Sequence, residues 1–288
     1  MKQRIALLYL MTGGGHLSGS KALAQVIEAE YGSTDETVLV NGFTDKMPIH
    51  NFFFEKGYRI SSNYLEPVWK FFYAVSGTKF VSGLTRRLTR RKVLEHLSDV
   101  IRDERVTKVV VLHPILTTFA REAIDRTRPG LPLITVVMDP FTAHGAWFYE
   151  PDSDFIVFSE QLKRVAMERF RVDERRLHLF PFMVSTKFDH RYTEAEKASA
   201  RASLGIPADS KVILIAGGGE GLKGAEAIVA EFIRKKMTET LIVVCGKNKV
   251  LHATLNKLVH LSKRKNILIL GFVTCMPDLM NVADCIVT

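Results

Sequence analysis

Apolar residues along the chain form short continuous runs that are separated by longer stretches with helical periodicity. The first run covers residues 5–10 without alternation of apolar and polar positions, and a helical pattern then extends to about residue 30. A continuous apolar run is typical of a strand buried on both faces, as in a parallel sheet. Gly13, Gly14 and Gly15 separate the two patterns, and we expect the helix to begin near Ser18 or Ser20. The opening of the chain therefore predicts a strand, a glycine-rich turn and a helix.

The same rhythm continues through the first two thirds of the chain. Strands alternating with helices are typical of an α/β fold with a parallel sheet. The polar stretch 185–210 interrupts the rhythm, so we expect it to link a domain over 1–184 to a second one over 211–288. Further strands are predicted at 37–40, 109–112, 133–138, 155–159 and 177–182, and helices over 94–105, 119–126 and 161–170.

A second strand, glycine turn and helix begin at residue 212. The glycine-rich loop is 217–221, and the helix is expected from about 223 to 236. This repeat predicts two Rossmann-like domains that face each other across a cleft. Further strands are predicted at 241–245 and 267–270, a short helix at 276–283 and the start of a strand at 285. Because that strand stops at Thr288, the second sheet is expected to be incomplete.

Composition and charge narrow the class of protein. The chain has 288 residues, of which 47% are hydrophobic and 25% charged, as in soluble globular proteins. We find no apolar run long enough to span a bilayer and no signal peptide, so we expect a cytoplasmic protein. A formal charge of +9 favours an anionic partner, whether nucleic acid, a membrane face or phosphorylated substrates. Three cysteines support neither a disulfide framework nor a zinc site and are expected to be small buried hydrophobes.

An aromatic and then basic segment follows the second strand. Aromatic rings beside cations are typical of an interfacial segment that meets anionic lipid. The alternatives are core aromatics with a solvated basic helix, or nucleic-acid binding, for which no binding motif is present. The aromatic residues are Phe52, Phe53, Phe54, Tyr58, Tyr64, Trp69, Phe71, Phe72 and Tyr73, and the basic ones are Lys79, Arg86, Arg87, Arg90, Arg91 and Lys92.

Polar residues follow several predicted strands directly. His16 follows the first glycine turn, His113 follows the strand at 109–112, and Asp139 follows the strand at 133–138, with His144 and Trp147 close behind. The carboxyl ends of parallel strands meet at one edge of a sheet, so we expect these residues to line one cleft. Asp139 is the expected general base there, and its alternative is a helix cap or a turn. For His16 a structural and a functional role remain equally open.

The glycine-rich turns do not match the common nucleotide motifs. The spacing of Gly13, Gly15 and Gly19 is one residue too long for the dinucleotide fingerprint, and no lysine follows as in a P-loop. The second loop at 217–221, with Lys223 near the expected helix start, would suit a diphosphate.

Motifs spread along nearly the whole chain resemble the diacylglycerol glycosyltransferases, which include processive glucosyltransferases and monogalactosyldiacylglycerol synthases. The resemblance implies a GT-B fold, a UDP-sugar donor, a lipid acceptor in the cytoplasmic leaflet, inversion at the anomeric carbon and no catalytic metal. It is carried by Gly13-Gly14-Gly15-His16, the aromatic and basic insert, Val137-Met138-Asp139 with His144 and Trp147, Phe180-Pro181-Phe182 before Phe188, Ala216-Gly217-Gly218-Gly219, Val243-Val244-Cys245-Gly246-Lys247-Asn248, and Leu270-Gly271-Phe272-Val273 leading to Ala283-Asp284.

The same resemblance assigns roles to individual residues. Asp139 would be the general base, and His16 would lie beside the acceptor or an activating anionic lipid. The acceptor and lipid set would also include Gly14, Gly15, His113, His144, Trp147, Trp69, Arg86, Arg87, Arg90 and Arg91. The donor set would be Gly218, Gly219, Gly221 and Lys247.

The sequence thus predicts an inverting hexosyltransferase that needs no cofactor and acts on diacylglycerol at the inner face of the membrane. An alternative is the related N-acetylglucosaminyltransferase that acts on a lipid-linked muropeptide, although Ser18-Gly19-Ser20 replaces the proline usual in that family. Another is a peripheral membrane-binding fragment without turnover. Because the family continues beyond residue 288 with donor-binding residues, we expect this chain to bind acceptor membrane but to transfer sugar slowly or not at all, and the sequence does not determine which sugar is used.

Overall fold

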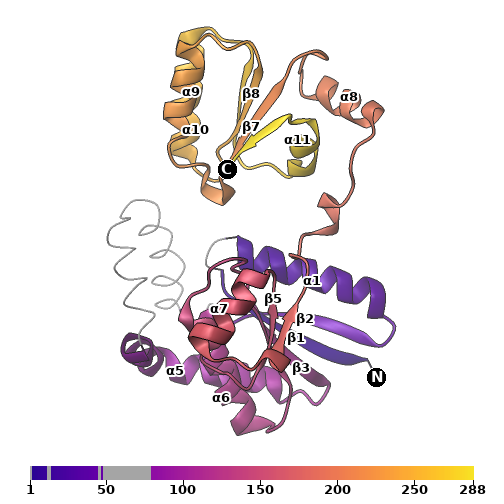
Figure 1. The fold of residues 1–288 in the computed structure, drawn as a ribbon, viewed down its shortest axis with the longest axis vertical. Helices are drawn as coiled ribbons and strands as arrows, with labels where there is room; N and C mark the ends of the chain where they lie inside the picture. The colour runs from indigo at the N-terminus through magenta and orange to yellow at the C-terminus, as the bar shows by residue number, and fades with distance from the viewer. Residues whose placement is uncertain (1, 12–13, 45–46, 48–78) are drawn as a thin grey trace. The chain divides into compact units, whose positions relative to one another are not determined.

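The computed structural model describes residues 2–11, 14–44, 47 and 79–288, and the side chains of all of these except 79–89. The chain divides into two compact units, Met1–Thr186 and Lys187–Thr288. Each unit is an α/β unit with a parallel sheet, as the periodicity predicts, and Figure 1 labels their helices and strands. The aromatic segment with Trp69 lies outside the described residues.

The sheet of the first unit has six parallel strands. Strand β2 pairs with one side of β1 and β3 pairs with the other, so the strand order reverses at β1. In doubly wound sheets, ligands bind at the carboxyl ends of the strands beside such a reversal. In order across the sheet the strands are β2 (Asp35–Asn41), β1 (Gln3–Tyr9), β3 (Val106–Val111), β4 (Leu133–Val136), β5 (Asp154–Val157) and β6 (Leu177–Leu179).

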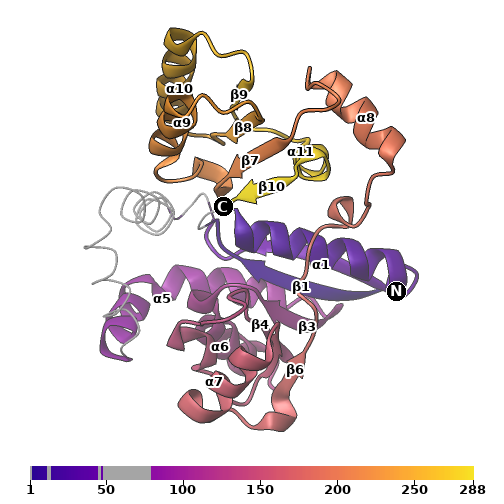
Figure 2. The ribbon, with the colours of Figure 1, turned by 45° about the horizontal axis from the view of Figure 1, so that its top comes forward.

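Helices cover both faces of this sheet. Helix α1 (Gly15–Tyr31) packs beside β1, as Figure 2 shows, and also contacts β2, and it shares a core cluster with Ile5 and Leu7. Ala6 and Leu8 point to the opposite face of the sheet and belong to the core cluster there. The helices on that face are α5 (Lys79–Ile101), α6 (Thr117–Thr127) and α7 (Glu160–Phe170). Successive residues of β1 are therefore buried on opposite faces, which confirms the prediction from its continuous apolar run.

The second unit has four parallel strands in the order β10-β7-β8-β9. Helices α9 (Ala225–Arg234) and α10 (Lys249–Ser262) cover one face, and α8 (Glu194–Ser203) and α11 (Met276–Val282) cover the other. Both faces of the central strands are covered: Leu214, Ile242 and Val243 have no exposed surface. The strands are β7 (Val212–Ala216), β8 (Thr240–Val244), β9 (Ile267–Leu270) and β10 (Cys285–Val287).

Two helices of this unit depart from the sequence-based expectations. No helix was expected at α10, and α8 lies inside the segment 185–210 that was expected to be a linker. Helix α8 forms because Thr193 and Glu196 make a reciprocal capping box at its start, with the Glu196 carboxylate accepting from the Thr193 backbone N–H at 2.7 Å. It packs on α11 through Ala200 and Leu204, so from Lys187 onward the segment belongs to the second unit.

The cysteines are not uniformly buried, so that expectation is wrong in part. Cys245 is buried, and burial raises the pKa of its thiol to about 11. Cys285 is exposed because β10 pairs only with β7 in the described sheet.

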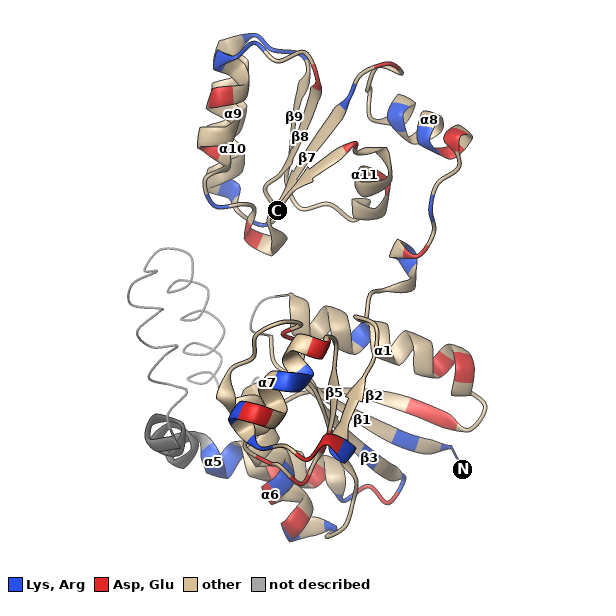
Figure 3. Cartoon of the chain, in the orientation of Figure 1, with Lys and Arg blue, Asp and Glu red and all other residues tan. Residues whose placement is uncertain are grey.

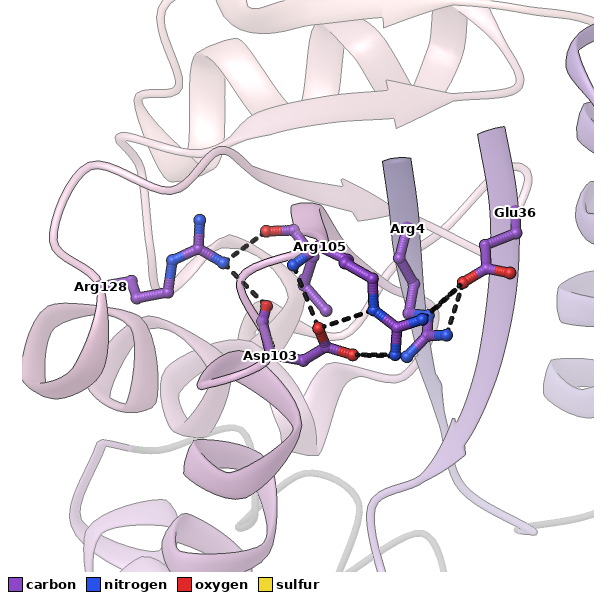
Figure 4. Close-up of polar contacts among 6 residues, drawn as sticks. Arg4, Glu36, Asp103, Arg105 and Arg128 are labelled. Carbon is purple, nitrogen blue, oxygen red and sulfur yellow. Dashed lines mark hydrogen bonds and ion pairs between the residues drawn. The ribbon is translucent and has the colours of Figure 1, made fainter. Parts of the chain in front are cut away.

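A cluster of charged residues joins the amino-terminal ends of the first three strands (Figure 4). Arg4 on β1 pairs with Glu36 on β2 and with Asp103, which lies in the turn before β3. Asp103 also accepts bonds from the backbone and the guanidinium of Arg105, at 3.1 and 2.9 Å. Arg128, after α6, donates to the backbone oxygen of Asp103 at 3.0 Å. The cluster lies at the sheet edge opposite the carboxyl ends of the strands, so it serves the fold and not the candidate site.

No described helix is long and apolar enough to cross a bilayer.

Candidate active site

The carboxyl ends of β1, β3 and β4 bring the predicted acceptor residues of the first unit together. Gly14 caps α1, whose first turn contains Gly15 and His16, so the helix begins earlier than the expected Ser18. Gly14 and Gly15 are exposed, and a Cβ on either would meet no atom within 4 Å. Gly19 differs, because a Cβ there would lie 2.4 Å from the Met138 Cε atom. Gly14 and Gly15 thus leave open space at the sheet edge, whereas Gly19 permits close packing.

His16 is fixed to the end of the neighbouring strand. Its Nδ1 atom lies 2.6 Å from the Leu112 carbonyl oxygen, which can only accept a hydrogen bond. Nδ1 therefore carries a proton. Burial lowers the pKa of His16, although the Leu112 bond and the Asp139 carboxylate act in the opposite direction. The ring is accordingly neutral at pH 7, and its Nε2 atom carries the lone pair.

His113 and His144 have a shared local role that their sequence positions did not reveal. Each accepts a backbone N–H bond at Nδ1, His113 from Ile115 and His144 from Ala146, both at 3.2 Å. Each thereby caps a short 3-10 helix, η2 (Pro114–Leu116) and η3 (Gly145–Phe148) respectively. His113 is buried, and burial, followed by the nearby His16, lowers the pKa of its ring well below the ordinary value. Both residues position the loops around the site.

Asp139 lies just beyond β4 and is half-buried. Its Oδ2 atom accepts a hydrogen bond from the Trp147 indole Nε1 at 2.8 Å. The Trp147 ring has no exposed surface, and its centroid lies 6.2 Å from that of His16. The His16 ring in turn meets His113 edge-on at 4.5 Å. The structure therefore brings Asp139, Trp147, His16 and His113 together, as the strand-end argument predicts.

The burial of Trp147 corrects one expected role. The resemblance places this residue against the acceptor, but a fully buried indole offers no surface to a lipid. It is buried because it belongs to the core cluster between η3, β5 and α7. Its contact with the site is the hydrogen bond to Asp139.

Two hydroxyl groups that the sequence-based reasoning missed hold the same loop. Ser159, the N-cap of α7, accepts from the Leu162 N–H at 3.0 Å and donates to the Pro140 carbonyl, next to Asp139. Thr117 is buried, and its hydroxyl lies 2.9 Å from the Pro114 carbonyl oxygen and 3.1 Å from the Ala146 carbonyl oxygen, which share its one proton. A serine before an acidic helix start is a capping signal that could have identified Ser159. Both hydroxyls donate to backbone carbonyls, whose positions in space cannot be read from a sequence.

The second unit places the predicted donor glycines after β7, where the strand order reverses. Gly218 and Gly221 have left-handed backbone angles, φ of 72° and 77°, and Gly218 and Gly219 are exposed. A Cβ on Gly218 or Gly219 would meet nothing within 4 Å, whereas one on Gly221 would lie 2.7 Å from the Leu251 side chain. Helix α9 begins only after Gly224, itself left-handed, so Lys223 precedes the helix and does not lie in its first turn as expected.

The loop after β8 supports the glycine loop. The Lys247 N–H donates to the Gly219 carbonyl at 2.7 Å, and a Cβ on Gly246 would lie 2.2 Å from that oxygen. Asn248 caps α10 through its side-chain oxygen and donates to the Glu220 carbonyl at 3.3 Å. The Lys247 ammonium lies 5.7 Å from the centre of the exposed Phe272 ring. The exposed glycines and an exposed cation thus share one end of this sheet.

The described arginines of the proposed lipid-binding set form ion pairs with acidic residues of the chain. The Arg90 guanidinium donates hydrogen bonds to the Glu122 carboxylate on α6, which raises the pKa of Arg90. The Arg91 guanidinium donates to the Glu95 carboxylate at 3.0 Å. Helix α6 carries both acidic and basic residues, as Figure 3 shows. The side chains of Arg86 and Arg87, like Trp69, lie outside the described residues. The expected lipid contacts therefore stay predictions.

Comparisons with known proteins show the family and the fold of the chain. The family model described as monogalactosyldiacylglycerol (MGDG) synthase matches residues 16–180, more than half of the chain. Monogalactosyldiacylglycerol synthase 1, chloroplastic, of Arabidopsis thaliana is 23% identical over 305 residues, which cover 99% of this chain and 54% of that protein. Probable monogalactosyldiacylglycerol synthase 2 of Oryza sativa subsp. japonica is 24% identical over 303 residues, covering 99% and 61%. The chain thus spans little more than half the length of these relatives.

Solved structures match the fold across the whole chain. Sucrose-phosphate synthase from Thermosynechococcus elongatus superposes with a TM-score of 0.61 at 14% identity, covering 99% of this chain and 75% of that one. A glycosyltransferase from Rickettsia africae gives 0.58 at 14% identity, covering 99% and 72%. HepE of Anabaena, solved in complex with UDP-glucose, gives 0.56 at 12% identity, covering 98% and 72%. These neighbours are GT-B proteins, which confirms the predicted fold class. By the match of the family model, the chain belongs to the monogalactosyldiacylglycerol synthase family.

Proposed function

We propose that the chain carries the acceptor site, and the start of the donor site, of an inverting glycosyltransferase that moves a hexose from a UDP-sugar to diacylglycerol. The observation that carries the proposal is the Asp139 carboxylate, held by Trp147 at the carboxyl end of β4 and close to His16, which follows the strand at the reversal. Membership of the monogalactosyldiacylglycerol synthase family supports the lipid acceptor. The UDP complexes of the structural neighbour HepE support the donor class.

The proposed chemistry needs a base because a lipid hydroxyl is a poor nucleophile until its proton is accepted. Asp139 Oδ1 accepts the proton of the acceptor hydroxyl while the hydroxyl oxygen bonds to the anomeric carbon. The bond between that carbon and the diphosphate oxygen breaks on the opposite face, so the configuration inverts and UDP leaves with the electron pair. His16, whose ring is fixed by the bond of Nδ1 to the Leu112 carbonyl, would orient the acceptor by contact beside Asp139, because the one hydroxyl proton of diacylglycerol goes to Asp139.

The donor groups act on the departing UDP. Exposed N–H groups around Gly218 and Gly219, and the Lys247 ammonium, would stabilise the negative charge that develops on the diphosphate. Gly221 shapes the loop, because only glycine fits its left-handed backbone against Leu251. No cofactor takes part in the proposed reaction.

The proposed location is the inner face of the membrane, with the chain bound peripherally. A net charge of +9 supports attraction to anionic lipid. Trp69, Arg86, Arg87, Arg90 and Arg91 would supply this contact, in addition to Gly14 and Gly15 at the acceptor site.

A transfer assay tests the proposed function. The chain is incubated with radiolabelled UDP-glucose, UDP-galactose or UDP-N-acetylglucosamine and with vesicles that contain diacylglycerol or a lipid-linked muropeptide. We expect labelled glycosyl-diacylglycerol whose linkage is opposite to that of the donor, as read by proton NMR coupling constants. Exclusive labelling of the muropeptide would overturn the proposed acceptor, and retention of configuration would overturn the single-displacement mechanism.

A further inference from the structure

The contact between Trp147 and Asp139 joins the hydrophobic core to the reacting carboxylate. The two residues lie eight positions apart on the same loop, and the indole Nε1 donates to Asp139 Oδ2 at 2.8 Å. No residue that the structure describes donates a hydrogen bond to the second oxygen, Oδ1. One oxygen is therefore fixed and the other remains open to a hydroxyl.

The indole has little freedom to move. Its ring is fully buried in a cluster with Phe148, Phe155 and Leu162, and Phe148 is stacked on Phe170 at 4.7 Å between ring centres. The short helix η3 that carries Trp147 is capped by His144 and bonded by Thr117. A donor held by close packing keeps its orientation without reorganisation when charge moves nearby.

The geometry points to Trp147 as the positioning residue of the general base. Its indole N–H holds Oδ2 so that Oδ1 faces the acceptor hydroxyl. Tryptophan suits this role because its N–H can only donate, so it cannot compete with the carboxylate for the proton of the acceptor. The catalytic consequence rests on the proposed function, whereas the hydrogen bond itself does not.

The first arm of the test is independent of activity. The chain contains two tryptophans, so a sample labelled with ¹⁵N at the indoles gives two Nε1–H signals, and Trp147→Phe identifies the signal of Trp147. We expect this signal to lie downfield and to exchange slowly in the wild type. In Asp139→Ala it should move upfield by about 1 ppm or more and exchange faster. An unchanged signal in Asp139→Ala would show that the indole does not hold the carboxylate, and the proposal would be wrong.

The second arm separates turnover from donor binding. Trp147→Phe should lower kcat about tenfold or more at pH 7 and leave the KM for the UDP-sugar unchanged. Ile101→Val is the control, because it shortens a buried side chain of the first unit in a core cluster that does not contain Trp147. It should lower the unfolding temperature but keep the wild-type kcat.

The outcomes separate the two proposals. If Trp147→Phe and Ile101→Val change kcat equally, Trp147 is only a core residue and the inference fails. If the wild-type chain transfers no sugar to any acceptor, the proposed function fails, while the indole signal still decides whether Trp147 holds Asp139. An indole bond without an effect of Trp147→Phe on an active enzyme also rejects the positioning role.

Discussion

At the scale of single residues, Gly246 is the position with the least tolerance for a side chain in the second unit. Its φ is 58°, and an added Cβ would lie 2.2 Å from the Gly219 carbonyl oxygen, which is backbone and cannot move aside cheaply. Gly246→Ala should therefore lower the free energy of unfolding of this unit by about 3 kcal/mol, from the left-handed backbone and the steric overlap together.

Gly205→Ala is the matched control, because Gly205 is also left-handed, with a φ of 68°, but has open space around it. Its cost should be about 1 kcal/mol, from the backbone alone. Urea unfolding followed by circular dichroism measures both variants, and tryptophan fluorescence reports the first unit separately because Trp69 and Trp147 belong to it. Equal costs for the two variants would show that the backbone contact at Gly246 is not tight.

The sequence predicted which residues of the first unit lie together at the candidate site, but it did not predict the role of each one. Asp139 and His16 were expected at strand ends, and the topology of a parallel sheet brings them together. His113 and His144 were expected at the acceptor, yet they cap short helices, because capping depends on backbone geometry that periodicity does not reveal. The burial of Trp147 could not be predicted, since an aromatic residue in a loop is compatible with the core and with the surface.

At the scale of elements, Ser159 couples the start of α7 to the loop after β4. Its hydroxyl accepts from the Leu162 N–H and donates to the Pro140 carbonyl. Ser159→Ala removes both bonds, so we expect the first unit to lose about 1 kcal/mol of stability, a typical cost of losing an N-cap. Thermal unfolding monitored by tryptophan fluorescence tests this.

Ser159→Asp helps to interpret that result. An aspartate can still cap the helix but cannot donate to Pro140, and its charge favours the helix start. It should recover most of the lost stability but less of the transfer activity, because the loop that carries Asp139 would be held less firmly. Full recovery of both would show that the Pro140 bond has no influence on the site.

The charged cluster in Figure 4 makes the stability of the first unit depend on pH. Hydrogen bonds from the Arg105 side chain and backbone lower the pKa of Asp103 from an ordinary 3.8 to about 2. A carboxylate with a lowered folded-state pKa stabilises the fold above its unfolded pKa and loses this effect as the pH falls. The contribution of Asp103 is therefore present above about pH 4 and disappears between about pH 4 and 2.

Asp103→Asn should accordingly be less stable than the wild type at pH 6, with a difference that shrinks toward pH 2. Asp99→Asn is the control, because Asp99 pairs only with Arg102 on the exposed surface of α5. Thermal midpoints of the first unit across this range provide the measurement. A constant difference between Asp103→Asn and the wild type from pH 6 to 2 would contradict the assignment.

The elements themselves were largely predictable, and the exceptions have physical causes. Continuous apolar runs identified the strands because parallel strands are covered on both faces. Helix α9 begins later than expected, since the left-handed Gly224 ends the preceding loop. Helix α8 was taken for linker because its sequence is polar, and it is stabilised by its capping box and by one narrow contact with α11.

At the scale of the whole molecule, net charge and the arginines of α5 predict binding to anionic membranes. Each cation near an anionic surface contributes on the order of 1 kcal/mol, so changing Arg86, Arg87, Arg90 and Arg91 to Gln should weaken vesicle binding by up to roughly a thousandfold. The ion pair of Arg90 with Glu122 and that of Arg91 with Glu95 would make the loss smaller. Sedimentation with anionic and neutral vesicles at low and high salt measures the effect.

A variant with Lys235, Lys236, Lys257 and Lys263 changed to Gln is the control, because it removes the same charge from the second unit. We expect it to bind anionic vesicles nearly as the wild type does. Equal losses of vesicle binding in both variants would show that binding depends on the total net charge and not on the α5 arginines. If the wild type bound neutral and anionic vesicles equally, electrostatic attraction would not contribute to binding.

The central claim is that Asp139 accepts the proton of a diacylglycerol hydroxyl, and its most direct test is the kcat of Asp139→Asn with a UDP-sugar and diacylglycerol vesicles. The variant keeps an oxygen for the Trp147 bond but cannot act as a base, so kcat should fall by about 10² to 10⁴ while the affinity for UDP is unchanged. Asp125→Asn, on the exposed face of α6, should retain wild-type turnover. Transfer to diacylglycerol by Asp139→Asn at the wild-type rate would contradict the account.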